Sequence, residues 1–395
     1  MPLLRNRLLH VFILTCLLGL VQTVSAGVIG GEYTLSTGSN GNLLGDSTST
    51  YDLYLSSNLK VKVYPLSCLE ITVNNDYSFY REFIGLNNMS SGITATYLPL
   101  ASTSPLSLYI TAKGTMLEYD KDFSGFDNNI AQLNVGAAYN LMPRVAVRSG
   151  VSHRMTHYVN AETSYIRSRD IYAGVNAALP YAFTFDLEGG FSRTNYLHKD
   201  ILPLFEDSLP PDPEEIFPIV YEDWRLRWVG DAESNLWLSY LSPRISRPLG
   251  DKTGLNVTFT RRVFTNYDGA LIYGFATQYL SPWASVWEGH DMSFGIKTYL
   301  VPRLIITSGI GYWEKMYLKT IERDPLTAFY ASSFNAPRRE DWQTRIYLGV
   351  QYPMKLPSGL FIEPAVNVEY TNNVSNKGVY NYSNFLVTAG IKAKI

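Results

Sequence analysis

This sequence has few cysteines, which cross-link many exported proteins, and few long apolar runs, which anchor others in membranes. Its 395 residues include two cysteines, and one of them, Cys16, lies in an apolar stretch near the N-terminus. Without that stretch only Cys68 remains, which excludes a disulfide-stapled extracellular module. No later segment has the ~20 apolar residues that a membrane-spanning helix needs. Neither disulfides nor spanning helices are therefore expected to organise the rest of the chain.

Charged residues are also few, and neither sign dominates. Lys and Arg number 33 and Asp and Glu 35, so that 17% of the residues are charged and the net charge is −2. This balance provides no general electrostatic attraction to nucleic acid. There is no Gly-rich phosphate loop and no cysteine metal motif. The sequence thus predicts no nucleic-acid partner, no cofactor and no metal.

The first 26 residues have the three parts of a secretory signal peptide. Arg5 and Arg7 provide a basic start, residues 8–21 form an apolar core, and small residues lead to Ala26. We expect cleavage after Ala26 and export of the remaining chain. The alternative is an uncleaved membrane anchor.

The exported part is dominated by alternation of polar and apolar residues. In residues 144–158, RVAVRSGVSHRMTHY, arginines at even positions alternate with Val145, Val147 and Val151. A period of two is that of a β-strand with one apolar and one polar face. Similar patterns occupy residues 51–63, 69–80, 106–116, 129–141, 180–195, 255–263, 292–300, 342–352, 360–370 and 383–395.

The connections between these segments are of two kinds that largely alternate. Short ones contain Pro143, Pro180, Pro302 or Pro353, and proline marks strand ends because it cannot donate a ladder hydrogen bond. Long polar ones cover residues 118–128, 159–164, 196–231, 319–340 and 371–380. Many of the predicted strands have about 11–15 residues, which is enough to cross a bilayer at a tilt of about 45°.

Alternation, two loop lengths and abundant aromatics (29 Tyr, 18 Phe, 7 Trp) resemble those of bacterial outer-membrane β-barrel proteins in general. The terminal segment YSNFLVTAGIKAKI resembles their last strand, although it ends in Ile395 and theirs usually ends in an aromatic residue. The resemblance implies an all-β fold, a transmembrane antiparallel up-and-down barrel of about 16 strands, with a range of about 14–18. It also implies contact with outer-membrane lipids and with the barrel-insertion machinery.

These patterns divide the chain into three parts. Residues 1–26 are the expected signal peptide, 27–50 a polar N-terminal segment too short for a plug domain, and 51–395 the barrel. A soluble β-repeat architecture is the alternative fold. The low charge and the length of the alternating segments favour the membrane barrel.

The polar faces of the strands are expected to line a water-filled lumen. A barrel of this size is too wide for side chains alone to fill. The charges on these faces are mixed, which argues against strong selectivity for ions of one sign. The predicted pore-lining residues are Arg144, Arg148, Arg154, Asp170, Asp186, Glu188, Arg262, Lys297, Arg345, Glu363 and Glu369.

Two rows of these residues are expected to cross neighbouring strands. If the chain turns at Leu179-Pro180, one row is Arg154–Asp170–Glu188 and the other is Arg148–Gly174–Asp186, where glycine leaves room for the ions to meet. The acidic, proline-rich residues 197–231 could narrow the mouth or be a solvated surface loop. The rows could select solutes or simply neutralise one another.

The predicted function is an outer-membrane pore for passive or substrate-biased diffusion of small polar solutes. The alternative is a structural or adhesive surface barrel with a blocked lumen, whose loops bind a partner. A facilitator of export or apolar uptake is disfavoured, because it usually needs an inward N-terminal hatch. No enzyme is predicted: Ser149 and His153 share a strand face but lie about 13 Å apart along it, beyond hydrogen-bond reach.

Overall fold

The computed structural model describes residues 29–42, 51–100, 104–159, 165–197, 233–267, 287–301, 303–317 and 339–394. The expected signal peptide and nearly all of the acidic segment 197–231 lie outside these residues. Within them, no helix is long and apolar enough to span a membrane.

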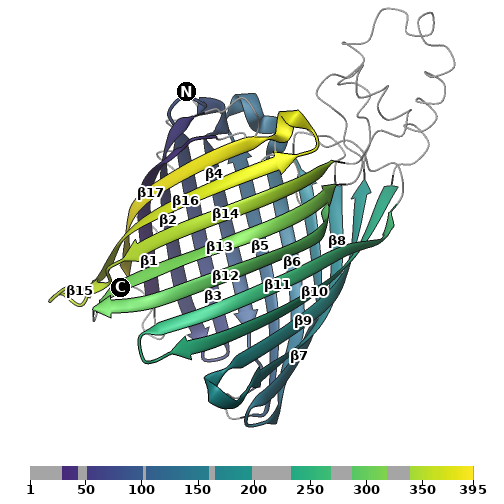
Figure 1. The fold of residues 1–395 in the computed structure, drawn as a ribbon, viewed down its shortest axis with the longest axis vertical. Helices are drawn as coiled ribbons and strands as arrows, with labels where there is room; N and C mark the ends of the chain where they lie inside the picture. Colours follow the sequence, from purple (N-terminus) through teal and green to yellow (C-terminus); the bar gives the residue numbers. More distant parts are fainter. Residues whose placement is uncertain are drawn as a thin grey trace, which may run out of the picture.

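The described chain folds into one antiparallel sheet that closes on itself (Figure 1). Sixteen strands form the closed ring; a seventeenth, the two-residue β15, pairs only with the start of β16. The closed all-β barrel and its strand number confirm the fold predicted from the sequence. The strands are β1 (Ile29–Asn40), β2 (Asp52–Leu66), β3 (Leu69–Tyr80), β4 (Asn88–Tyr97), β5 (Leu106–Tyr119), β6 (Asn128–Met142), β7 (Val145–Tyr158), β8 (Tyr165–Ala178), β9 (Thr184–Leu197), β10 (Glu233–Leu249), β11 (Thr253–Tyr267), β12 (Trp287–Val301), β13 (Leu304–Tyr317), β14 (Glu340–Gln351), β15 (Met354–Lys355), β16 (Phe361–Ser375) and β17 (Tyr382–Lys394).

Closure depends on β1, which pairs with β2 on one side and with β17 on the other. The barrel therefore begins at Ile29 and not at residue 51, which corrects the boundary predicted for the polar N-terminal segment. Tyr33 and Leu35 alternate there with Glu32 and Thr34, but the many Gly, Ser and Thr residues weaken the pattern. The strand is stable because neighbours on both sides complete its hydrogen bonds, which also leaves the sheet without a free edge.

The connections separate the barrel into two ends. At the turn end, residues 67–68, 143–144, 250–252 and 302–303 join consecutive strands. At the loop end, strands are joined by residues 198–232, 268–286 and 318–339, and by segments that contain the 3-10 helices η1 (Ile84–Leu86), η2 (Lys121–Phe126) and η5 (Gly378–Tyr380). Another 3-10 helix, η3 (Pro180–Ala182), lies at the turn end, as do β15 and the C-terminus (Figure 1).

The polar face of the sheet is its concave, inner face. The hydroxyls of Tyr109 on β5 and Tyr172 on β8 meet across two intervening strands. Tyr54 on β2 reaches Thr388 on β17 across β1, with 2.8 Å between the hydroxyl oxygens. Side chains from non-adjacent strands converge only on the inside of a closed sheet. The opposite face carries exposed Leu, Ile, Val and aromatic side chains, as the alternation predicts.

The loop end is tied together by a buried ion pair. The Arg339 guanidinium pairs with Asp341, and both side chains are almost fully buried. The guanidinium lies over the rings of Tyr317, at 4.3 Å, and Tyr380, at 3.4 Å. Burial disfavours its charge, but the hydrogen bond to Asp341 leaves the pKa of Arg339 raised. Asn373 donates to Asp341 at 3.2 Å, so the cluster joins β13, β14, β16 and η5.

Candidate functional site on the inner wall

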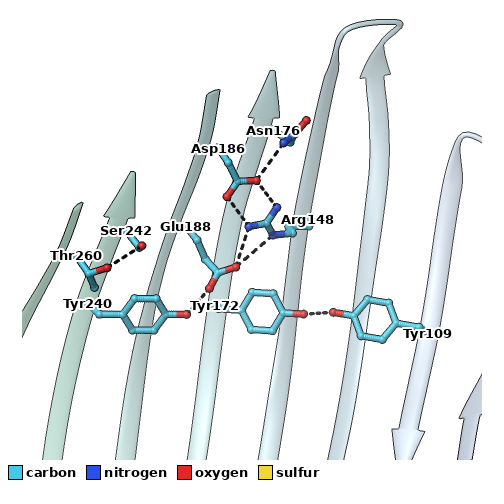
Figure 2. A network of polar contacts seen from close by, with 9 residues as sticks. All are labelled: Tyr109, Arg148, Tyr172, Asn176, Asp186, Glu188, Tyr240, Ser242 and Thr260. Carbon is cyan, nitrogen blue, oxygen red and sulfur yellow. Dashed lines mark hydrogen bonds and ion pairs between the residues drawn. The ribbon is translucent and has the colours of Figure 1, made fainter. Parts of the chain in front are cut away.

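Three charged side chains meet on the inner wall over β7, β8 and β9 (Figure 2). The Arg148 guanidinium donates two hydrogen bonds to Asp186, Nη1 to Oδ2 at 2.7 Å and Nη2 to Oδ1 at 2.9 Å. It also donates to Glu188 Oε2, from Nη2 at 2.9 Å and from Nε at 3.3 Å. All three side chains are partly exposed, between 23% and 31%. One arginine therefore binds two carboxylates while remaining open to the lumen; we call these three residues the inner triad.

The inner triad exists because β8 has a glycine where the arginine crosses it. Arg148 lies directly opposite Gly174, which in turn lies opposite Glu188. A Cβ at Gly174 would come within 3.2 Å of Arg148 Nε and 2.8 Å of the Leu187 carbonyl oxygen. The missing side chain lets the guanidinium lie flat across β8 and reach β9.

The network extends beyond the triad to β8 and β10, the strands on either side of the one that bears both acids. Asn176 donates to Asp186 Oδ2 at 3.1 Å, and the Tyr240 hydroxyl donates to Glu188 Oε1 at 2.8 Å. Figure 2 shows Tyr240, Tyr172 and Tyr109 along the same wall, beside the triad. With these bonds, each acid of the triad has a hydrogen-bond donor in addition to Arg148, which holds the carboxylates in place.

The tyrosines lie over glycines of neighbouring strands. A Cβ built on Gly136, Gly150 or Gly190 would lie 2.3–2.6 Å from a tyrosine ring or hydroxyl atom; the tyrosines are Tyr109, Tyr172 and Tyr240, respectively. Aromatic rings that cover glycines on an adjacent strand shield the exposed backbone and pin the strand register. The rings therefore lie along the wall and do not project across the lumen.

Other ion pairs are distributed around the inner wall. Glu32 on β1 binds Lys392 at 3.0 Å and lies 3.9 Å from Lys394, both on β17. Lys62 binds Glu70 at 2.7 Å, and Arg345 pairs with Glu369. The wall thus carries both signs of charge at several places, with local pairs that reduce the net field across the lumen.

The predicted rows are corrected by the observed register. Arg148 does reach Asp186, as predicted, but it binds Glu188 as well. The row Arg154–Asp170–Glu188 does not form, because Arg154 lies opposite Ser168 and Asp170 lies opposite Ser192. A tight turn at Leu179-Pro180 was expected, whereas residues 179–183 with η3 connect β8 and β9. The longer connection moves the partner of Asp170 from Glu188 to Ser192 and that of Gly174 from Asp186 to Glu188.

The remaining predicted residues are scattered. Arg144 lies in the exposed turn at residues 143–144 and not within a strand, because Pro143 ends the preceding pairing. Arg262 lies over Trp287, at 4.3 Å from the ring centre. Lys297 lies 5.5 Å from the Tyr299 ring centre, and Glu363 lies opposite Lys392 in the β16–β17 register.

Three contributors were missed by sequence reasoning. Glu32 was missed because its strand was assigned to a polar segment; the alternation around Tyr33 and Leu35 could have found it. Tyr240 lies on the inward face of β10 together with Ser242 and Arg244. The sequence already indicates this, because the three are alternate residues. The Arg339–Asp341 pair carries no signal in the sequence, because its burial arises from Tyr317 and Tyr380 on distant segments.

Comparison with known proteins supports the architecture. The solved structure of CdiB from Acinetobacter baumannii is similar with a TM-score of 0.51 and 11% identity, over 92% of this chain and 60% of that one. The likeness is one of fold, that of a closed antiparallel β-barrel.

Two further solved structures are similar to this barrel. OccAB1 from Acinetobacter baumannii has a TM-score of 0.47 and 8% identity, over 94% of this chain and 97% of that one. OprB from Pseudomonas putida has a TM-score of 0.48 and 12% identity, over 93% and 94%. Neither a protein-family model nor a curated protein sequence matches the chain. The function therefore has to be argued from the inner wall.

The inner wall of this barrel can bind and orient polar groups by hydrogen bonds and charge. The triad presents an arginine between two carboxylates, with tyrosine hydroxyls beside them. Over the residues that the structure describes, no group of three or more His, Cys, Asp or Glu side chains could hold a metal ion. The arrangement suits transient contact with solutes through several weak interactions.

Proposed function

We propose that this protein is an outer-membrane pore for passive or substrate-biased diffusion of small polar solutes through a mixed-charge lumen. One observation carries the proposal: the large side chains of the inner network lie flat against the wall. Arg148 lies across Gly174, and the tyrosines lie over their own glycines. Such a wall is polar and leaves the lumen open for water, which suits diffusion.

The mechanism follows from the charges that line the path. A solute that passes the inner triad exchanges water hydrogen bonds for contacts with Arg148, Glu188 and Tyr240. Because both signs are present and already paired, each contact is weak enough for the solute to leave. Passage is then governed by the width of the lumen and by a modest bias toward solutes with both donors and acceptors.

Single-channel recording in planar bilayers, combined with cysteine labelling, tests this proposal. Cys68 is replaced by serine to remove the free thiol. Ser242→Cys then places a thiol on the inner face of β10, and Ser239→Cys places one on the outer face of the same strand. A membrane-impermeant, bulky thiol reagent is added after insertion.

The expected result is stepwise conductance in all variants, reduced by the reagent in Ser242→Cys and unchanged in Ser239→Cys. Absence of conductance steps from correctly folded, inserted protein would contradict a pore. That outcome would favour the alternative of a surface barrel with a blocked lumen, whose loops bind a partner.

A further inference from the structure

The outward face of β7, β8 and β9 carries a group of basic side chains near the loop end. Arg167 and Arg169 on β8 are exposed, and Arg193 on β9 is half-buried. These three arginines lie on the same face of the sheet as the exposed apolar residues Val151 and Ile171, so they face away from the lumen. We call Arg167, Arg169 and Arg193 the outer cation patch.

The patch brings like charges together without a neutralising acid. Arg169 and Arg193 are directly opposite each other in the β8–β9 register, and His153 lies opposite Arg169 on the other side. Like charges in such cross-strand positions destabilise a sheet. Over the described residues, strands β6 to β9 have no Asp or Glu on their outward face, and no ion pair engages Arg167 or Arg169.

Farther around the outward face, beyond β10, a group of charged side chains does contain an acid. On β11, β12 and β13, the outward side chains of Arg261, His290 and Glu314 contact one another. Arg261 Nη1 lies 3.1 Å from His290 Nδ1, and His290 Nε2 lies 3.1 Å from Glu314 Oε2. That group contains its own carboxylate, whereas the outer cation patch does not.

Arg193 is held by an aromatic ring and an amide on the neighbouring strand. Its guanidinium lies 4.8 Å from the Trp237 ring centre, and Nη2 donates to Asn235 Oδ1 at 3.1 Å. Its Nε is buried and has no hydrogen-bond partner among the described residues. The contacts with Trp237 and Asn235 hold the Arg193 guanidinium at the outward face and, among the described residues, leave its charge without a carboxylate.

The patch lies at the boundary of the apolar band. Val151, Ile171 and Phe191 form one cross-strand row, and the row containing Arg169 and Arg193 is two residues farther toward the loop end. Two residues correspond to about 7 Å along a strand. An arginine on the lipid face is costly at the bilayer midplane and tolerated near the interface, so the row marks the headgroup level.

We propose that the outer cation patch binds the phosphate of an anionic lipid headgroup in the leaflet at the loop end. Arginine pairs with phosphate through two parallel hydrogen bonds, and a phosphate between Arg169 and Arg193 would neutralise their repulsion. A lipid fits this place because its acyl chains would cover Val151, Ile171 and Phe191 below the patch. The proposal is independent of whether the lumen conducts.

Native mass spectrometry of the protein, refolded into lipid-free detergent, tests the proposal. The probes are lipid A with two phosphates, the same lipid A with both phosphates removed, and inorganic phosphate. The phosphorylated lipid is expected to bind about tenfold more tightly than the dephosphorylated one. Inorganic phosphate is expected neither to bind measurably nor to displace the lipid, because it gains nothing from the apolar band.

Matched variants locate the binding site. Arg169→Gln removes a cation from the outer face of β8, whereas Arg154→Gln removes one from the inner face of the neighbouring strand. The first should weaken binding of the phosphorylated lipid about tenfold, and Arg169→Lys should recover part of it. Arg154→Gln should leave binding within about twofold of the unaltered protein, because its charge faces the lumen.

Three outcomes would overturn the proposal. Equal binding of the two lipids by unaltered protein would show that the phosphate is not recognised. Equal loss of binding in Arg154→Gln and Arg169→Gln would show that the outer face is not the site. Displacement of the lipid by inorganic phosphate would identify a free anion as the ligand. Retention of the heat-dependent gel shift of a folded barrel confirms that each variant is folded, and the lipid comparison needs no variant at all.

Discussion

Neutralising Arg148 and neutralising Glu188 are expected to change the ion selectivity of the barrel in opposite directions. The inner triad contains one cation and two anions, so it has one net negative charge. Arg148→Gln leaves two negative charges, whereas Glu188→Gln leaves none. The first variant should attract cations more strongly than the unaltered protein, and the second should attract them less.

The size of the effect follows from the charge and its surroundings. In water, one unit charge acts on an ion about 8 Å away with about 0.5 kcal/mol. That energy changes the local ion concentration about twofold. The partial exposure of the triad, at 23–31%, justifies a water-like dielectric constant and not that of a buried pair. Each variant should therefore change the cation-to-anion permeability ratio about twofold.

Reversal potentials across a salt gradient measure this ratio. Salt near 10 mM keeps the Debye length at about 30 Å, so the charges act across the lumen. Glu314→Gln is the control, because it removes the same charge from the outward face near the loop end. A shift of the same sign in Arg148→Gln and Glu188→Gln, or an equal shift in the control, would refute the assignment of the triad to the conducting path.

Three further predictions concern stability and packing. Gly174→Val should separate Arg148 from its carboxylates, because a Cβ would lie 3.2 Å from Nε and 2.8 Å from the Leu187 carbonyl oxygen. In the same reversal-potential assay its selectivity should change less than that of Arg148→Gln, because the cation moves but is not removed; an equal change would contradict this. Arg339→Ala should destabilise the barrel by about 3–5 kcal/mol, since it leaves the fully buried carboxylate of Asp341 without its cation. The heat-dependent gel shift should then occur at a lower temperature, and an unchanged temperature would contradict the role of this pair. Asp52→Ala should loosen the β3–β4 connection, because the Asp52 carboxylate accepts three of its backbone N–H groups at 2.9–3.2 Å; faster protease cleavage within residues 81–87 would show this, and unchanged cleavage would count against it.

Much of the inner wall could be predicted, because the face on which a strand residue lies follows from its place in the local alternation. The alternation around Arg148, Asp186 and Glu188 assigns all three to one face without any knowledge of their partners. Which of them meet was not predictable, since it depends on the number of residues in the β8–β9 connection. Pro180 signals a turn there, but not the five residues that the turn contains.

The closure of the barrel illustrates the same limit on a larger scale. Residues 29–40 are rich in Gly, Ser and Thr, and their pattern is weak when read alone. They form a strand because β2 and β17 offer unpaired backbone groups on both sides, and β17 lies more than 300 residues later in the chain. The Arg339–Asp341 pair likewise depends on rings from β13 and η5 that the local sequence does not contain.

The sequence by itself determined the all-β class, the approximate strand number and the polarity of each strand face, because each depends on the alternation of neighbouring residues. The tertiary structure alone decided where the ring closes, which charges share an acceptor and which cations are left facing outward without one. The physical reason is that cross-strand register and closure are set by turn length and by backbone pairing between distant segments. The residues of one strand are enough to predict the face on which each side chain lies. The contacts that those side chains make depend on the neighbouring strands.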